Sequence, residues 1–111
     1  MAGKLDTNKM RQKAFTSAPL DTTFVLRASK AIDKISIGTH QTALLGGIAP
    51  TSVNREAMEM SFVIAALSTV LIDPRDFDFS TVEDEDTLFE LYKEWREWNL
   101  SFRPTPVAIV E

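Results

Sequence analysis

The sequence predicts a mainly α-helical domain whose centre is an αα-hairpin of two long helices, at about residues 53–72 and 81–102. Three observations predict it. The stretch 57–72 is apolar and free of glycine and proline, aromatic residues stand three and four apart within 87–103, and an Asp-Pro step separates the two stretches. A short N-terminal extended segment or strand and flexible termini complete the expected fold. Two antiparallel helices joined by a short loop are a common helical unit.

Length and composition limit the chain to one globular unit. It has 111 residues, of which 44% are hydrophobic and 25% charged, and it contains no cysteine. These values are close to ordinary globular usage, and the lack of cysteine excludes disulfides and thiolate chemistry. We expect a single mainly helical domain at 20–103, preceded by a basic flexible arm at 1–19 and followed by a proline-containing tail at 104–111.

Charge is distributed unevenly along the chain, although the net charge is only −4. Residues 1–34 carry seven basic and three acidic side chains, whereas residues 76–111 carry three basic and ten acidic ones. Such asymmetry suggests head-to-tail self-association, folding of the N-terminal arm over the acidic end, or two different partners, while each charged run by itself also fits a solvated face. A pI near 5.0 argues against nucleic acid as a partner. The most apolar window is shorter than a membrane span and contains Glu59, so no membrane partner is expected.

The first predicted element is a strand at 22–28, TTFVLRA, where β-branched and aromatic residues are concentrated. The pattern at 29–45 fits a helix, but the alternation of Ile35 and Ile37 also fits a strand, so the conformation of this stretch stays open. The Gly-Gly pair that follows is expected to end the element and open a loop.

Ser52 is the predicted N-cap of the first long helix, which begins at Val53. Beyond Glu59 this helix is apolar on nearly all sides, so it must be covered on all sides. The cover is expected to come from the rest of the chain, from a second copy or from another protein. The Asp73-Pro74 step is expected to end the helix, because proline cannot continue its hydrogen-bond ladder.

The second long helix is expected to follow a loop in which Phe77 and Phe79 alternate with aspartates and pin the loop to the core. Ser80 and Glu83 fit a capping box, which places the helix start near residue 81. Along this helix runs a continuous apolar seam, with Tyr92 beside it: Leu88, Leu91, Trp95, Trp98 and Phe102.

The seam has two interpretations. Its simplest role is packing against the apolar helix at 53–72. Large apolar patches with aromatic anchors are also typical of binding surfaces, and the basic arm offers charge to a partner. The candidate protein-interaction residues are Phe62, Leu88, Leu91, Tyr92, Trp95, Trp98, Phe102, Lys9, Arg11 and Lys13.

No stretch of the sequence predicts catalysis. His40 is the only histidine, and no second histidine, cysteine or acid stands near it at the spacing of a metal site or a catalytic pair. An EF-hand starting at Asp76 needs glycine and glutamate where this chain has Thr81 and Thr87. We therefore expect no enzyme activity, no cofactor and no metal site, while divalent-ion binding by the acidic stretch 76–86 stays open.

A family resemblance rests on the order of four features. These are FVLRA at 24–28, LLGG at 44–47, an apolar helix ending in VLIDPRDFDF at 70–79, and an acid-led LFELYKEW at 88–95. In this order, over residues 22–103, the sequence resembles the small tail assembly chaperones of long-tailed bacteriophages and similar short phage morphogenesis proteins. The resemblance implies a mainly helical, non-enzymatic protein that keeps a long tape-measure protein soluble while tail-tube subunits assemble around it. It implies no catalytic residue.

The expected function is therefore protein–protein interaction in phage tail morphogenesis, as a tail assembly chaperone that binds the tape-measure protein. Its partners would be other phage tail or particle proteins, and it would act in the host cytoplasm during assembly. Two alternatives stay open. A structural, minor component of the phage particle would be retained in the virion, its arms ordered on neighbouring subunits. A small acidic inhibitor or immunity-type protein would set its acidic C-terminal part against a basic target.

Overall fold

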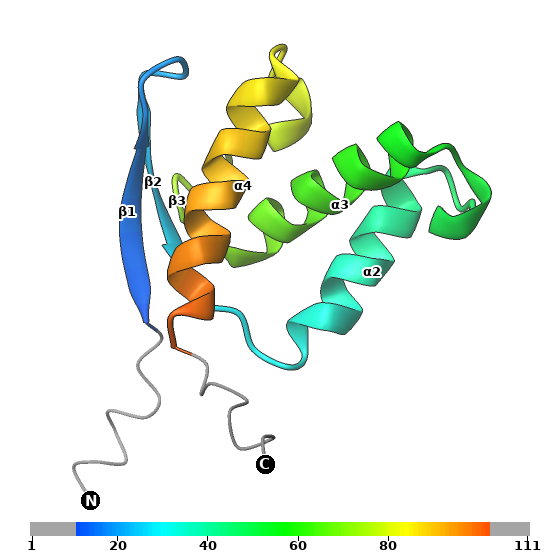
Figure 1. Ribbon diagram of the computed structural model, residues 1–111, viewed down its shortest axis with the longest axis horizontal. Coiled ribbons are helices and arrows are strands. Elements are labelled where there is room, and N and C mark those ends of the chain that lie inside the picture. Colours follow the sequence, from blue (N-terminus) through cyan, green and yellow to red (C-terminus); the bar gives the residue numbers. More distant parts are fainter. Residues whose placement is uncertain (1–10, 103–111) are drawn as a thin grey trace, which may run out of the picture.

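The computed structural model describes residues 11–102 and, within them, an α+β fold of three helices and a three-stranded antiparallel sheet (Figure 1). The prediction of a mainly α fold built on a hairpin of two long helices is therefore wrong. The elements in chain order are β1 (Gln12–Ser17), β2 (Thr22–Arg27), α2 (Asp33–Leu44), the 3-10 helix η1 (Pro50–Ser52), α3 (Arg55–Val70), β3 (Leu71–Asp73), the 3-10 helix η2 (Phe79–Thr81) and α4 (Glu85–Leu100).

The strand β1 lies in the region predicted to be a flexible arm. It is the outer strand of a sheet with the order β1-β2-β3, and its register with β2 is unbroken from Gln12↔Arg27 to Ser17↔Thr22. The only large apolar residue of β1 is Phe15, so its own pattern is too weak to predict a strand. β1 forms because β2 offers it a pairing edge. The remainder of the predicted arm, 1–10, and the predicted tail lie outside the described residues.

The helix α3 is shorter than predicted at both ends. Its N-cap is Asn54 and not Ser52, because the Asn54 side chain accepts a hydrogen bond from the N–H of Ala57 at 2.8 Å. After Val70 the chain leaves the helix, and Leu71–Asp73 pair with β2. Apolar residues suit the end of a buried helix and a buried strand equally well, so the pattern alone does not separate α3 from β3.

The helical hairpin is formed by α2 and α3, not by the two predicted long helices (Figure 1). Near the end of α2, Gln41 donates from Nε2 to the carbonyl oxygen of Met58, near the start of α3, at 3.0 Å. Ile37 of α2 packs on two alanines of α3. α2 ends as the Gly-Gly pair predicts, since Gly46 and Gly47 adopt positive φ angles of 70° and 89°. The stretch left open at 29–45 is therefore mostly helix.

The main core lies between the sheet, α3 and α4. The predicted seam on α4 does face inward, but it packs on the sheet as well as on α3, as shown by Phe15 of β1, whose ring meets that of Trp98 at 5.8 Å between centroids. Figure 1 shows α4 running alongside the strands on the side from which α2 and α3 project. The buried members of this core are Phe15, Phe24, Leu26, Val63, Leu67, Val70, Phe79, Leu88, Leu91 and Trp95.

The loop between β3 and α4 is pinned to the core by Phe77 and Phe79, in agreement with their spacing. Phe79 is fully buried, and the rings of Phe77 and Phe79 lie 4.9 and 5.3 Å from that of Phe24, between centroids. The three rings form one cluster at the sheet end of the core. Because both loop rings pack on Phe24 of the sheet, the loop has a defined position, and it places the start of α4 against the sheet.

The predicted capping box at the start of α4 does not form. Asp78 accepts hydrogen bonds from the N–H of Ser80 at 3.0 Å and from its hydroxyl at 2.6 Å, so Ser80 belongs to η2 instead. These hydrogen bonds, the side-chain one first, hold the pKa of Asp78 below its ordinary value. α4 begins at Glu85 with Asp84 as its N-cap. The sequence predicts a helix start in this region, but the N-cap is Asp84 and not Ser80.

Candidate protein-interaction site

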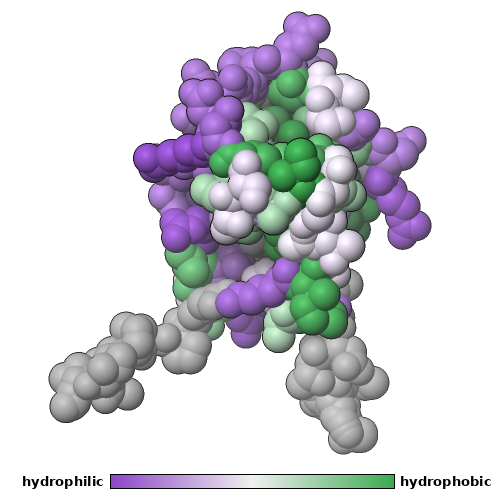
Figure 2. All heavy atoms as spheres, turned by 90° about the vertical axis from the view of Figure 1, so that its right-hand side faces the viewer, coloured by the Kyte–Doolittle hydropathy of each residue, from purple (hydrophilic) through white to green (hydrophobic). Residues whose placement is uncertain are grey.

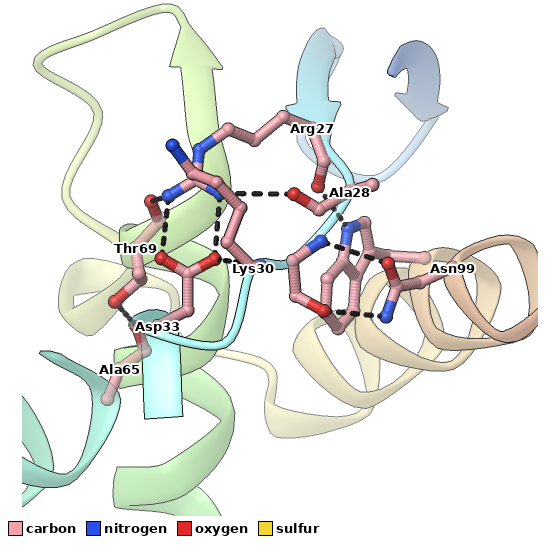
Figure 3. Close-up of polar contacts among 9 residues, drawn as sticks. Arg27, Ala28, Lys30, Asp33, Ala65, Thr69 and Asn99 are labelled. Atoms are coloured by element: carbon pink, nitrogen blue, oxygen red, sulfur yellow. Dashed lines mark hydrogen bonds and ion pairs between the residues drawn. The ribbon is translucent and has the colours of Figure 1, made fainter. Parts of the chain in front are cut away.

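A buried ion pair holds the start of α2 against the sheet and α3 (Figure 3). Arg27, at the end of β2, donates to the two carboxylate oxygens of Asp33 at 2.7 and 2.9 Å. The same guanidinium donates to the carbonyl oxygen of Thr69 in α3 at 3.1 Å. Asp33 is 3% exposed and also accepts the N–H of Lys30 at 2.6 Å. One arginine therefore joins β2, α2 and α3.

The helix α4 is tied to the same connection between β2 and α2. Asn99 accepts the N–H of Ser29 and donates to its hydroxyl, both at 3.0 Å. The indole N–H of Trp95 donates to the carbonyl oxygen of Arg27 at 2.9 Å. Because both sides of the connection are held, α2 and α4 keep a defined spacing across α3.

A groove lies between α2 and α4, with α3 at its base. One part is a hollow of about 540 Å³ whose lining includes Ile37, Ala66 and Trp95. The other part is a hollow of about 410 Å³ toward the start of α3. Both parts are lined by Phe62 and Tyr92, whose rings meet edge to face with centroids 6.0 Å apart. We treat the two hollows as one groove with this aromatic pair at its middle.

The groove is the place where the apolar helix α3 is not fully covered by the rest of the chain. The helices α2 and α4 and the sheet cover most of it, but Phe62 remains 39% exposed. Beside it, burial raises the pKa of Tyr92, although the charge of Arg96 acts in the opposite direction. The phenol is therefore a neutral hydrogen-bond donor at physiological pH. The exposed strip of α3 thus offers an aromatic anchor site with one polar group.

Exposed apolar residues are concentrated on the α2–α3 hairpin. Figure 2 looks onto the end of the hairpin and shows hydrophobic residues gathered at its centre, with hydrophilic ones around them. Near this end Leu44 and Ile48 are 39% and 50% exposed. Five of the seven large apolar residues exposed in residues 11–102 belong to this hairpin: Ile32, Ile35, Leu44, Ile48 and Phe62.

The rim of the groove is positively charged. Lys30, Lys34 and Arg96 line its larger part and are exposed. The ion pairs within residues 11–102 are Arg27 with Asp33 and the exposed pair of α3, so none of the three rim cations has an acidic partner there. The larger part of the groove is therefore basic in a protein whose net charge is −4, whereas Glu59 lines the smaller part. The larger part favours a ligand that is apolar on one side and acidic at its edges.

The predicted interaction residues do not form a single surface. Leu88, Leu91 and Trp95 are 2%, 3% and 4% exposed, so they belong to the core. Phe62 and Tyr92 line the groove. The seam of α4 is therefore mainly a packing face, although the edge of Trp95 also lines the groove beside Tyr92.

The remaining predicted residues that the structure describes gather beside β1. Trp98 is half-buried, and its ring lies 5.0 Å from that of Phe102. The guanidinium of Arg11 lies 4.3 Å from the Phe102 ring, and Nζ of Lys13 lies 5.3 Å from the ring of Phe15. Lys9 lies outside the described residues.

The sequence did not predict the cations on the rim of the groove. Two of the three, Lys30 and Lys34, belong to 29–45, whose conformation the pattern left open.

A second, acidic hollow of about 380 Å³ lies between the β1–β2 turn and α4, lined by Asp84, Asp86, Glu90 and Glu94. Among residues 11–102 no three acids, histidines or cysteines gather as a metal site would require. The sequence left divalent-ion binding by the acidic stretch 76–86 open. Two aspartates of this stretch, Asp78 and Asp84, are the N-caps of η2 and α4. Within the same residues, no helix has the length and apolar character to cross a membrane.

Comparisons with protein families, with curated proteins and with solved structures found no match to this chain. The apolar base, aromatic centre and basic rim of the groove are features of a protein-binding surface.

Proposed function

We propose that the protein is a non-enzymatic protein-binding module, and that its groove holds an amphipathic helix of another protein. One observation carries the proposal: Phe62 and Tyr92 stand at the centre of an open apolar groove framed by helices. Grooves of this kind bind a helix through apolar side chains repeated every three or four residues. The cations on the rim favour a helix with acidic residues beside its apolar face.

We propose further that the module acts as a tail assembly chaperone of a long-tailed bacteriophage, with the tape-measure protein as its client. The sequence resemblance over 22–103 supports this role. A chaperone for a long helical client needs an accessible apolar surface and no reactive group, and the groove meets the first requirement through Phe62 at 39% exposure. Binding would keep the apolar face of the client away from water until tail-tube subunits replace the chaperone.

Replacing Phe62 with aspartate is expected to abolish client capture while leaving the fold intact. A central aromatic anchor typically contributes about 2 kcal/mol or more to binding, which corresponds to a loss of affinity of about thirty-fold. The measurement is mass spectrometry of proteins captured from an assembling lysate by a tagged copy. Thermal melting of each variant checks that the fold is retained.

The matched control is Phe102→Asp. Phe102 is 37% exposed, close to the 39% of Phe62, but it lies beyond the end of α4 and does not line the groove. The proposal expects tape-measure or tail proteins with the wild type and with Phe102→Asp, and their loss with Phe62→Asp. Equal capture by all three proteins would contradict a client site in the groove.

Comparing the captured proteins with purified particles separates the two alternatives. A structural, minor component would be present in finished particles in stoichiometric amounts. An inhibitor would capture one small basic protein through the hollow at Asp84, Asp86, Glu90 and Glu94, and added salt would weaken that complex. The chaperone proposal expects capture from the lysate together with absence from particles.

A further inference from the structure

The outer edge of β1 carries backbone groups that do not pair within the sheet. The N–H of Ala28 donates to the carbonyl oxygen of Arg11 at 2.8 Å, which makes these two a hydrogen-bonded pair. Hydrogen-bonded and non-bonded pairs alternate along an antiparallel ladder, so Lys13, Phe15 and Ser17 bond to β2. The backbone groups of the residues between them, Gln12, Ala14 and Thr16, therefore point outward.

A side-chain contact supports this assignment. The hydroxyls of Thr16 and Thr23 lie 3.0 Å apart. Side chains approach most closely at non-bonded pairs, and the register places these two threonines opposite each other in such a pair. The outward direction of the Thr16 backbone follows from the same alternation.

No element of residues 11–102 lies along this edge. β1 is terminal in the strand order, and Figure 1 shows it as the outermost element on its side. The strand has six residues, no proline and an unbroken register with β2. An open edge of this kind is a template for another strand.

We propose that β1 pairs with β1 of a second copy, antiparallel about a two-fold axis at Ala14, so that two sheets become one. The outward groups then meet as three hydrogen-bonded pairs: Ala14 with Ala14, Gln12 with Thr16, and Thr16 with Gln12 of the second copy. Lys13 stands opposite Phe15 of the second copy in a non-bonded pair. The edge is therefore complementary to itself, as an interface with two-fold symmetry requires.

Charge selects this register over its neighbours. A shift toward the start of the strand sets Lys13 opposite Lys13 or Arg11 of the second copy, and like charges directly opposite are destabilising. A shift of the two-fold axis toward Ser17 leaves fewer than three hydrogen-bonded pairs between the two β1 strands. Lys13 lies on the sheet face that carries α4, and the Ala14 register sets it opposite Phe15 of the second copy, next to the acidic hollow that Thr16, Glu90 and Glu94 line. The basic start of one copy thus approaches the acidic helix of the other.

Replacing Ala14 with lysine tests the interface. Ala14 is exposed on the sheet face opposite α4, so the monomer tolerates the longer side chain, but two lysines would face each other at the two-fold axis. The matched control is Ala43→Lys, at an exposed position of α2 away from the sheet. Sedimentation equilibrium over a wide concentration range measures the mass of each protein.

The wild type and Ala43→Lys are expected to pass from 12.4 kDa toward twice that mass as concentration rises, while Ala14→Lys stays at 12.4 kDa. A wild type that stays at 12.4 kDa throughout, or an Ala14→Lys variant that doubles its mass as the wild type does, would overturn the proposal.

Hydrogen exchange of the wild type alone gives a second test, which requires no variant to fold. The amides of Lys13 and Phe15 are expected to be protected at every concentration, because they bond to β2. The amides of Gln12, Ala14 and Thr16 are expected to gain protection only at high concentration. Free exchange of all three at the highest concentration would refute the pairing. Phe62→Asp should leave this exchange pattern unchanged, because Phe62 lies in the groove and not at the edge of β1. The test of the β1 edge is therefore independent of the test of the groove.

Discussion

Replacing Trp95 with alanine is expected to lower the free energy of unfolding by about 3 to 5 kcal/mol, the range found for large aromatic residues removed from a core. Trp95 is 4% exposed and packs in the core between the sheet and α3. Its indole N–H also donates to the carbonyl oxygen of Arg27 at 2.9 Å, and alanine leaves this acceptor without its donor. Chemical denaturation measures the loss.

Two variants test whether core packing is the cause. Trp95→Phe keeps most of the ring but not the donor, so it should cost less than alanine. Trp98→Ala, one turn later, should also cost less, because Trp98 is only half-buried against Phe15 and Phe102. If Trp95→Ala melted like the wild type but lost its partner, the residue would be part of a contact surface and the assignment to the core would be wrong.

Replacing Arg27 with alanine is the second change with a large expected effect, a loss of about 3 to 5 kcal/mol, because removing one partner of a buried pair leaves the other charge uncompensated. Asp33 would remain at 3% exposure without its guanidinium, and the carbonyl oxygen of Thr69 would lose a donor. The connection between the sheet and the α2–α3 hairpin would be weakened at the same time. Denaturant unfolding measures the effect.

The chain supplies its own comparison in the ion pair of Arg55 with Glu59, whose side chains are 84% and 44% exposed. Arg55→Ala should change the free energy of unfolding by about 0 to 1 kcal/mol, as exposed pairs do. A double replacement, Arg27→Met with Asp33→Leu, should cost less than Arg27→Ala, because neither charge remains buried. Similar losses for the two arginines would show that burial does not control this contact.

Stability is expected to fall in acid through Asp33. Burial alone raises the pKa of this carboxyl, but the hydrogen bonds from Arg27 and from the N–H of Lys30, together with the charges of both residues, lower it below 3.8. Near pH 3.8 the unfolded chain therefore binds more protons than the folded one. The stabilisation is fully present above this pH and is lost as the pH falls through the lower, folded pKa.

Unfolding measured from neutral pH down to about pH 3 checks this sign. The difference between the wild type and Asp33→Asn should be largest at neutral pH and should shrink in acid. A difference that grows as the pH falls would mean that the pKa of Asp33 is raised in the folded protein.

Elements whose signal is local were predicted from the sequence alone. The helices α3 and α4 and the strand β2 each carry their own apolar pattern, and all three lie where that pattern places them, within a few residues at the ends. The pinning of the loop by Phe77 and Phe79 also follows from residue type and spacing, as does the end of α2 just before the Gly46-Gly47 pair. Composition alone excludes disulfides, because the chain has no cysteine.

Only the tertiary structure decided which elements pack together. Both β1 and β3 form through hydrogen bonds to β2, and β3 is far from β2 in the sequence. Neither strand has enough apolar periodicity to be recognised from its own residues. The seam of α4 predicted a buried face, but a helical face does not specify its neighbour, and in the folded chain its neighbours are the sheet as well as α3. The basic groove arises where α2, α3 and α4 meet, so it exists only through contacts between residues far apart in the chain.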